Sequence, residues 1–350
     1  MGKLLLITFL LTIGFCAVSS ADEKAPVERH GFLRVEGNTV VDEHGEPTQL
    51  RGMSFFWSQW MEKYYNRHVV DWLVEDWKVT VVRAAMGVKH DETLSGYLYD
   101  RSQERLVRRV VDAAIRNGIY VIIDWHSYYA HNYVEEAVEF FESMARRYGD
   151  HPNIIYEIYN EPKQVSWDEV VKPYAEQVVS AIRAIDPNNL IIVGTPHWCQ
   201  RVDEAAMNPL EGENIVYGLH FYAASHKEDL RQRARIALDK GIPLFASEFG
   251  TCLYSGDGYL DSLETEAWFD FMDKHNISWC NWSIGDKDET ASALVPGARY
   301  YGGWSENELT RSGRMIRRKL RYYAGVEEEE EEPQEEKEER RRRIRIRPLR

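Results

Sequence analysis

The sequence contains few cysteines and no closely spaced pair of them. Four occur in 350 residues, and Cys16 lies in a leader that we expect to be removed, which leaves Cys199, Cys252 and Cys280. Without a Cys-x-x-Cys spacing a zinc site has little support, and no feature requires a metal or organic cofactor. Cys199 and Cys252 follow predicted strands and could approach one another, whereas Cys280 is expected to pack as a small hydrophobic residue.

Long apolar runs are also missing after the first segment. Residues 4–18 are apolar but fall short of the roughly 20 residues that cross a membrane. Lys3 precedes them and Ser19-Ser20-Ala21 follows, which predicts a signal peptide over residues 1–21; an uncleaved anchor or a buried helix is the alternative. We therefore predict a secreted, extracellular protein with no membrane contact after cleavage.

An excess of positive charge is absent as well. The formal net charge of −14 disfavours nucleic acid and anionic polysaccharide as partners, and a neutral polymer fits better. The tail, residues 326–350, divides into a Glu-rich and an Arg-rich block with almost no aromatic residues. This composition predicts a solvated or disordered segment, with a short charged helix as the alternative.

Short apolar runs and amphipathic segments alternate along the rest of the chain. The runs cover residues 50–55, 80–85, 120–124, 154–159, 190–194, 215–220, 243–248 and 278–282, and the clearest helical segments cover 101–117, 134–148, 167–185, 230–240 and 263–275. About eight strands alternating with helices predict an α/β fold, a single (β/α)8 TIM barrel over residues 22–325. A doubly wound sheet is the second interpretation, although no Gly-rich dinucleotide motif follows the first strand.

A β-hairpin is expected before the barrel. Residues 31–42 form two short apolar-polar segments around Gly37-Asn38, a typical turn pair. We expect this N-terminal hairpin to cap part of the fold.

Two predicted strands lead to a glutamate. The run 154–159 is followed by Asn160-Glu161-Pro162, and the run 243–248 ends at Glu248. Because the C-terminal strand ends of a barrel gather at one face, we expect both carboxyls there. A glycosidase needs one carboxyl to donate a proton and one to attack the sugar. Taken singly, each Glu would be explained as well by a strand-end salt bridge.

Other polar and aromatic side chains that could bind or act on a substrate lie at the C-terminal ends of predicted strands. They are Arg83, His126, Asn160, Trp198, His220, Tyr222 and Trp282. Each alone has an ordinary structural explanation, but their shared position predicts a site. The 11 Trp and 20 Tyr residues suit a cleft that grips sugar rings.

These motifs together resemble glycoside hydrolase family 5, and within it the secreted endo-β-1,4-glucanases of subfamily 2. The resemblance runs from about residue 31 to 324 and rests on several segments in the family's order. They are Leu50-Arg51-Gly52-Met53-Ser54, Val82-Arg83-Ala84-Ala85-Met86, Asp124-Trp125-His126-Ser127, Tyr159-Asn160-Glu161-Pro162, His220-Phe221-Tyr222-Ala223, Ser247-Glu248-Phe249-Gly250-Thr251, Asn281-Trp282-Ser283 and Asp286-Lys287-Asp288-Glu289.

The resemblance implies roles for the catalytic residues. Glu161 is expected to be the acid/base and Glu248 the nucleophile of a retaining mechanism. Arg83 and Tyr222 are expected to keep Glu248 ionised and oriented, since opposite charge lowers the pKa of a carboxyl. His220 is expected to help set the protonation of Glu161.

It also implies how substrate is held. Asn160 is expected to hydrogen-bond the sugar 2-hydroxyl, and His126 to brace the cleft floor. The platform beneath the sugar at the cleavage subsite is expected to be Trp282, with Trp198 on the leaving-group side. Trp60 is expected to bind substrate too.

On the non-reducing side, Lys287 and Glu289 match positions that bind the sugar two subsites from the cut. The chain departs from the family there in two places. Phe55-Phe56-Trp57 stands where the subfamily commonly has a His, and Gly87 where an aromatic is common. These departures leave the glycone contacts, and the choice among β-1,4-linked polymers, open.

We therefore predict a monomeric retaining endo-β-1,4-glucanase, a cellulase acting on cellulose or related β-glucans. A β-1,4-xylanase or mannanase is the first alternative, and a catalytically inactive carbohydrate-binding protein is the second. A barrel isomerase or aldolase would need a Schiff-base Lys or a phosphate-binding Gly loop, and neither occurs at the strand ends.

Overall fold

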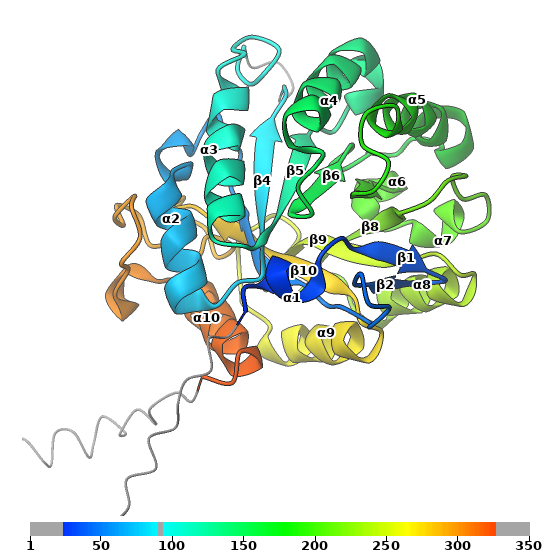
Figure 1. Ribbon diagram of the computed structural model, residues 1–350. Coiled ribbons are helices and arrows are strands. Elements are labelled where there is room, and N and C mark those ends of the chain that lie inside the picture. The colour runs from blue at the N-terminus through cyan, green and yellow to red at the C-terminus, as the bar shows by residue number, and fades with distance from the viewer. Residues whose placement is uncertain (1–23, 90–93, 327–350) are drawn as a thin grey trace, which may run out of the picture.

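A closed barrel of parallel strands forms the centre of the molecule (Figure 1). The computed structural model describes residues 24–89 and 94–326. The barrel strands are β3 (Arg51–Phe55), β4 (Val81–Gly87), β5 (Tyr120–His126), β6 (Ile154–Glu157), β7 (Leu190–Val193), β8 (Ile215–Tyr222), β9 (Leu244–Gly250) and β10 (Ser278–Ile284). They neighbour one another in the order β10-β3-β4-β5-β6-β7-β8-β9. All eight overlap predicted runs, and the (β/α)8 barrel is confirmed.

Helices surround the strands, and the longer ones pack their apolar sides on the outer face of the barrel. The helices are α1 (Pro26–His30), α2 (Arg67–Trp72), α3 (Gln103–Arg116), α4 (Val134–Tyr148), α5 (Lys172–Arg183), α6 (Pro196–Cys199), α7 (Val202–Ala205), α8 (Glu228–Asp239), α9 (Ser262–Lys274) and α10 (Arg311–Tyr323). Short 3-10 turns cover Glu62–Tyr64, Ala130–Asn132 and Glu306–Glu308, and π turns cover Leu73–Trp77 and Trp167–Val171.

The sequence did not predict α10. Six of its 13 residues are Arg or Lys, so its pattern is dominated by charge. Its buried side carries only Ser312, Gly313, Ile316 and Leu320, and a Cβ on Gly313 would lie 2.1 Å from the carbonyl oxygen of Ala293. Helix α10 therefore packs through close backbone contact at Gly313 rather than through bulky apolar side chains.

Inside the barrel, side chains change from apolar to polar along β4, β5, β6 and β9. Successive residues of a strand face opposite sides, so every second residue points inward. Val81, Ile122, Ile155 and Phe245 form an apolar layer near the N-terminal strand ends. Two positions further along stand Arg83, Asp124, Glu157 and Ser247, all buried. The barrel interior is thus apolar near the N-terminal strand ends and carries polar and charged groups nearer the C-terminal ends.

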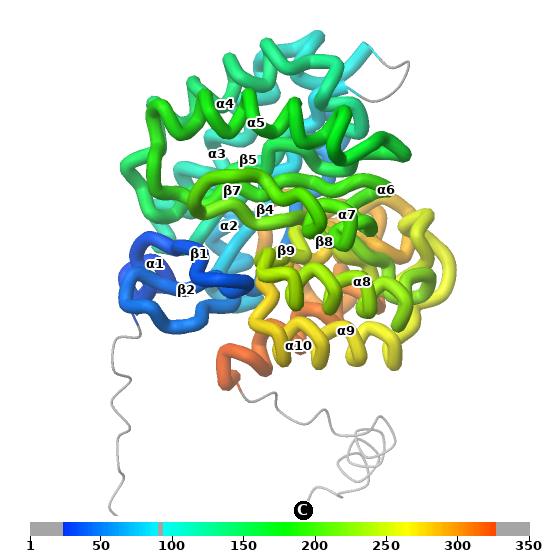
Figure 2. The backbone as a smooth tube through the Cα atoms, turned by 90° about the vertical axis from the view of Figure 1, so that its right-hand side faces the viewer, coloured from blue at the N-terminus to red at the C-terminus, as the bar shows by residue number. Residues whose placement is uncertain are grey.

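The predicted hairpin is present and covers the N-terminal end of the barrel. Its strands β1 (Arg34–Glu36) and β2 (Thr39–Val41) are antiparallel. Leu33 and Val40 pack against the apolar layer described above. Figure 2 shows α1, β1 and β2 at one end of the molecule, away from α6. The hairpin thus covers the N-terminal end of the barrel, and the C-terminal end, which the polar groups face, is left uncovered by it.

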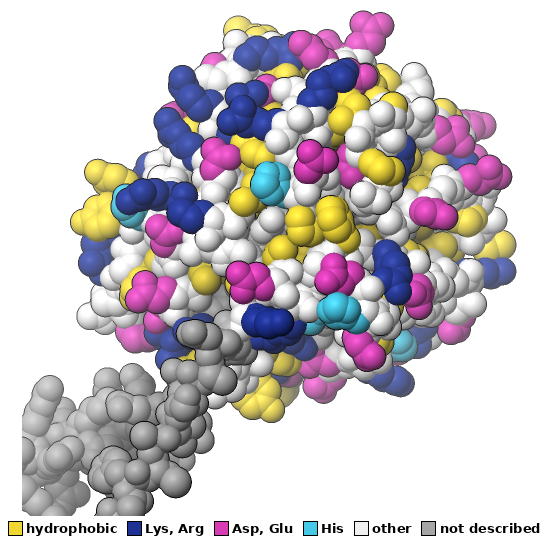
Figure 3. Space-filling model, viewed as in Figure 1, with side chains coloured by type: hydrophobic (Ala, Val, Ile, Leu, Met, Phe, Trp, Pro, Cys, Tyr) yellow, Lys and Arg dark blue, Asp and Glu magenta, His cyan; other side chains and the backbone are white. Residues whose placement is uncertain are grey.

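Two sequence predictions lie outside the described residues: the signal peptide at 1–21 and nearly all of the tail at 326–350. No described helix combines the length and hydrophobicity needed to cross a bilayer. On the face shown in Figure 3, Lys and Arg side chains are interspersed with Asp and Glu.

Candidate active site

The two candidate catalytic glutamates face each other at the C-terminal end of the barrel. Glu161 lies four residues beyond the end of β6, where its backbone N–H donates to the Ser127 carbonyl at 3.3 Å. Glu248 lies within β9. One oxygen of each carboxyl and a ring nitrogen of His220 all lie within 4.8 Å of one another. This separation suits a retaining glycosidase, whose carboxyls stand about 5–5.5 Å apart.

A β-bulge places Glu248 in the interior. Between the pairs Gly218–Phe245 and His220–Glu248 the register shifts, so β9 contains one residue more than β8. Ser247 and Glu248 can therefore both point inward although they are consecutive. Bulges of this kind commonly redirect a side chain next to an active site.

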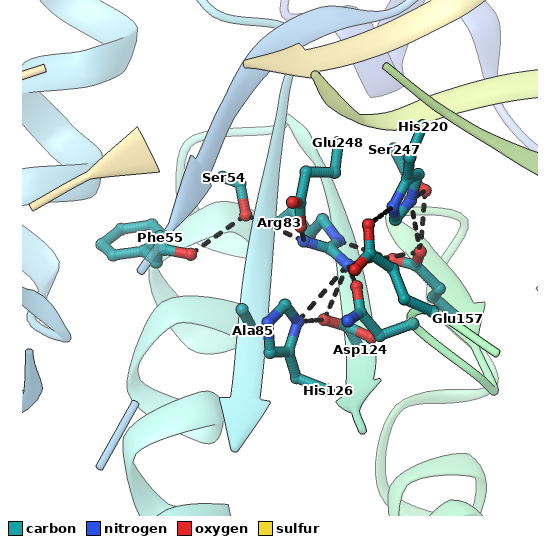
Figure 4. Close-up of polar contacts among 12 residues, drawn as sticks. Ser54, Phe55, Arg83, Ala85, Asp124, His126, Glu157, His220, Ser247 and Glu248 are labelled. Carbon is teal, nitrogen blue, oxygen red and sulfur yellow. Dashed lines mark hydrogen bonds and ion pairs between the residues drawn. The ribbon is translucent and has the colours of Figure 1, made fainter. Parts of the chain in front are cut away.

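Arg83 stands at the centre of the polar layer, fully buried (Figure 4). Its guanidinium contacts three carboxylates: Glu157 at 2.6 Å, Asp124 at 2.9 Å and Glu248 at 3.1 Å. It also donates to Asn160 Oδ1 at 2.6 Å. Arg83 therefore fixes the nucleophile candidate and the amide beside the acid candidate at once.

The electrostatics of Glu248 differ in part from the prediction. Burial and the neighbouring Glu161 raise the pKa of Glu248 above its ordinary value, and Arg83 and the Tyr222 hydroxyl only oppose this rise. That hydroxyl donates to Glu248 Oε1 at 2.9 Å. Arg83 and Tyr222 thus act in the predicted direction, but burial outweighs them.

The second carboxylate on Arg83, Glu157, is strongly acidic. Burial would raise its pKa, but Arg83 and His220 outweigh this and lower the pKa to about 2. Asp124 behaves oppositely, because burial raises its pKa well above the ordinary value despite Arg83. Arg83 and His220 therefore favour the ionised form of Glu157, whereas burial opposes ionisation of Asp124.

His220 links the two catalytic candidates to this layer. Its Nδ1 lies 2.9 Å from Glu161 Oε1, and its Nε2 lies 2.9 Å from Ser247 Oγ. Burial would lower the pKa of His220, but Glu157 and Glu161 outweigh it and raise the pKa to about 9. This pKa favours the protonated form of His220 at neutral pH, and the influence of His220 on Glu161 stays a prediction.

This shift predicts a pH dependence of stability. A raised folded-state pKa stabilises the protein below the unfolded value of 6.5, and that contribution is lost as the pH rises through about 9. His220→Asn should remove an alkaline loss of unfolding free energy on the order of 3 kcal/mol between pH 6 and 10. Urea unfolding across this range measures it. His226→Asn is the control, because burial lowers the pKa of His226, and an equal flattening in both variants would contradict the assignment.

A cleft of about 520 Å³ lies over these groups, and its walls contain many Phe, Trp and Tyr side chains. Every predicted substrate-binding residue lines it: Trp60, Trp198, Trp282, Lys287 and Glu289. The His126 ring stacks parallel to Trp282 at 5.2 Å and bonds Asp124 Oδ2 at 2.6 Å. His126 therefore braces the predicted platform.

Of the two departures from the family, the segment 55–57 reaches this cleft, because Phe56 and Trp57 line it. Phe56 packs against Trp282, with ring centroids 5.2 Å apart. At Gly87 a Cβ would lie 1.5 Å from Gln59 Oε1, so the Gln59 side chain occupies the space where a residue at 87 would begin. The missing aromatic is thus matched by a glutamine from the preceding strand-to-helix segment.

Sequence reasoning assigned no role to several residues that the structure places here. Glu157, Asp124 and Ser247 hold Arg83 or His220, and the Cys199 thiol donates to the Asn160 carbonyl at 3.0 Å. A charged residue inside the apolar run 154–159 was the available signal for Glu157. Cys199, Cys252 and Cys280 are all buried and unpaired, so the possible Cys199–Cys252 disulfide is not formed.

Within residues 24–89 and 94–326, one group of side chains has the spacing of a metal site: Glu161, His220 and Glu248. A histidine must be deprotonated to ligate a metal, whereas the pKa of His220 is raised to about 9. Arg83 already pairs with Glu248. These residues suit proton transfer and nucleophilic attack better than metal ligation.

Fold and site together define a barrel enzyme with a facing pair of carboxyls. Comparison with known proteins gives the family: residues 41–288 match the model for Cellulase (glycosyl hydrolase family 5). The chain belongs to glycosyl hydrolase family 5.

Individual relatives agree. The chain is 44% identical over 334 residues to Endoglucanase A of Evansella cellulosilytica, covering 93% of this chain and 68% of that one. It is 50% identical over 290 residues to Endoglucanase Z of Dickeya dadantii, covering 81% and 65%. The chain thus spans about two thirds of these relatives. Its structure is similar to the catalytic domain of Thermobifida fusca endoglucanase Cel5A, with a TM-score of 0.81 and 37% identity over 85% of this chain and all of that one.

Proposed function

We propose that this protein is a retaining endo-β-1,4-glucanase that cleaves internal bonds of a β-1,4-glucan. The observation that carries the proposal is the pair Glu161 and Glu248, with oxygens within 4.8 Å of each other beneath an aromatic cleft. Relatives named endoglucanases at 44% and 50% identity support it, as does the Thermobifida fusca structure solved with cellotetraose.

The geometry supports a two-step mechanism. Glu248, oriented by Arg83 and Tyr222, attacks the sugar carbon while Glu161 donates a proton to the leaving oxygen. In the second step Glu161 takes a proton from water, which releases the sugar from Glu248 with retained configuration. Since Arg83 engages the Asn160 Oδ1, the amide nitrogen of Asn160 remains to donate to the sugar 2-hydroxyl.

Reducing-sugar release from a panel of β-1,4-glucans, xylans and mannans tests the substrate class. Highest activity on glucan is expected, and a preference for xylan or mannan would select the alternative enzyme. A protein that binds glucan without cleaving it would be the catalytically inactive binder. Secretion after removal of residues 1–21, a catalytic domain over 22–325 and a monomeric state belong to the same proposal.

Loss of the acid/base should depend on the leaving group. Glu161→Ala should lower kcat/KM on cello-oligosaccharides by about 10²–10⁴-fold, the usual worth of general acid catalysis. The loss should be much smaller on 2,4-dinitrophenyl β-cellobioside, whose leaving group needs no proton. Glu176→Ala, on the exposed side of α5, is the control. Equal losses on both substrates would remove Glu161 from this role.

A further inference from the structure

A second hollow of about 700 Å³ adjoins the catalytic cleft, and Trp60 lines both. The other residues around this second hollow are Gln59, Glu62, Lys63, Tyr65, Asn66, His68, Arg109, Tyr300 and Tyr301. They come from the segment after β3, from α2 and α3, and from the loop after β10. The two hollows therefore form one continuous surface across Trp60.

Three large aromatic side chains on this surface are exposed. Relative exposure is 43% for Trp60, 56% for Tyr300 and 52% for Tyr301. The two tyrosine rings lie edge to face, with centroids 5.3 Å apart. Tyrosines so exposed add little to the core, so packing does not explain them.

The loop that carries these tyrosines is anchored through its backbone. Asn66 Nδ2 donates to the Tyr300 carbonyl at 2.7 Å. Gly302 has φ +80°, and a Cβ there would lie 2.6 Å from the Cβ of Trp72, so the loop lies tightly on α2. The rings are thus presented on a fixed backbone, which lowers the entropy cost of binding.

The second hollow extends the cleft in a definite direction. Trp60 contacts Trp57 and Phe56, and the Lys287 ammonium lies 5.8 Å from the Phe56 ring centre. Lys63, on the second hollow, pairs at 2.7 Å with Asp286, next to Lys287. Trp198 instead follows β7, which neighbours neither β3 nor β10 in the barrel. The extension therefore lies on the side of Lys287 and Glu289, away from the leaving-group platform.

We propose that Tyr300 and Tyr301, reached across Trp60, bind further sugar units of the same glucan chain that occupies the cleft. Aromatic faces pack on the apolar C–H faces of sugar rings, and tyrosine adds a hydroxyl that hydrogen-bonds. His68 and Arg109, exposed on the same walls, offer donors to sugar hydroxyls. The inference rests on the proposed function, and it predicts a binding surface that acts only on chains long enough to reach it.

The test compares a long and a short substrate. In the double variant Tyr300→Ala/Tyr301→Ala, the ratio of kcat/KM on hydroxyethylcellulose to kcat/KM on p-nitrophenyl β-cellobioside should fall about threefold to tenfold. Tyr322→Ala is the matched control, because this tyrosine is 72% exposed on α10 and lines neither hollow. Its ratio should equal that of the wild type. Tyr300→Phe/Tyr301→Phe should keep most of the wild-type ratio, since the rings remain.

Three outcomes are distinguishable. A ratio in the double variant equal to that of the Tyr322→Ala control overturns the inference and leaves the proposed function intact. Equal kcat/KM losses on both substrates, with a lowered melting temperature, would show that the tyrosines support the fold, and this also overturns it. A wild type that cleaves neither substrate would instead overturn the proposed function itself.

Discussion

Glu248→Ala should abolish hydrolysis of β-1,4-glucan, with a loss in kcat above about 10⁴-fold, because no covalent glycosyl-enzyme can form without the carboxylate. Sodium azide should restore turnover of 2,4-dinitrophenyl β-cellobioside. The small anion fits the space that the Glu248 side chain leaves, and it attacks the face opposite the leaving group. One displacement then replaces two, so the product should be the α-glycosyl azide.

The matched control for this rescue is Glu161→Ala. That variant keeps Glu248, so the covalent intermediate still forms and azide opens it in a second displacement, which gives the β-glycosyl azide. Proton NMR of the anomeric position distinguishes the two products. Recovery of the β-azide from Glu248→Ala would exclude Glu248 as the nucleophile, and so would wild-type hydrolysis with inverted configuration.

Arg83→Met should lower the free energy of unfolding far more than a surface substitution does. The change leaves Glu157, Asp124 and Glu248 buried without the guanidinium that contacts all three. Removing one partner of a buried ion pair typically costs about 3–5 kcal/mol, because the remaining charge is uncompensated. Urea unfolding should show this loss, and activity should fall as well, because Glu248 and Asn160 lose their shared anchor.

Arg317→Met provides the comparison for Arg83. Arg317 contacts Asp76 at 2.6 Å and 2.8 Å, but on the outside of the barrel, where α10 lies against the π turn Leu73–Trp77. Because this pair is partly solvated, its loss should lower the free energy of unfolding less than the loss of Arg83 does. If the two substitutions lowered the unfolding free energy equally, the polar layer would not depend on Arg83 in the way described.

Much of the secondary structure could be predicted from short stretches of the sequence. The strand that leads to Glu161 is a run of apolar residues, and the helices between strands repeat apolar residues at helical spacing. Element type follows from such short-range patterns, and the barrel's closure brings all C-terminal strand ends together. Glu161, Glu248, His220 and Tyr222 could therefore be placed at one site before any contact was known.

By itself, the sequence determined the alternation of strands and helices, the family and the two catalytic candidates. Only the tertiary structure decided which groups meet inside the barrel. Arg83 and Glu157 are 74 residues apart and touch because β4, β5 and β6 are neighbours, and Glu248 joins them because of a bulge. Tyr300 lines the same hollow as Trp60 because its loop is anchored on α2. A local pattern sets the direction of a side chain along its own strand, but its partners depend on strand order, register and loop anchoring, which arise only when the barrel closes.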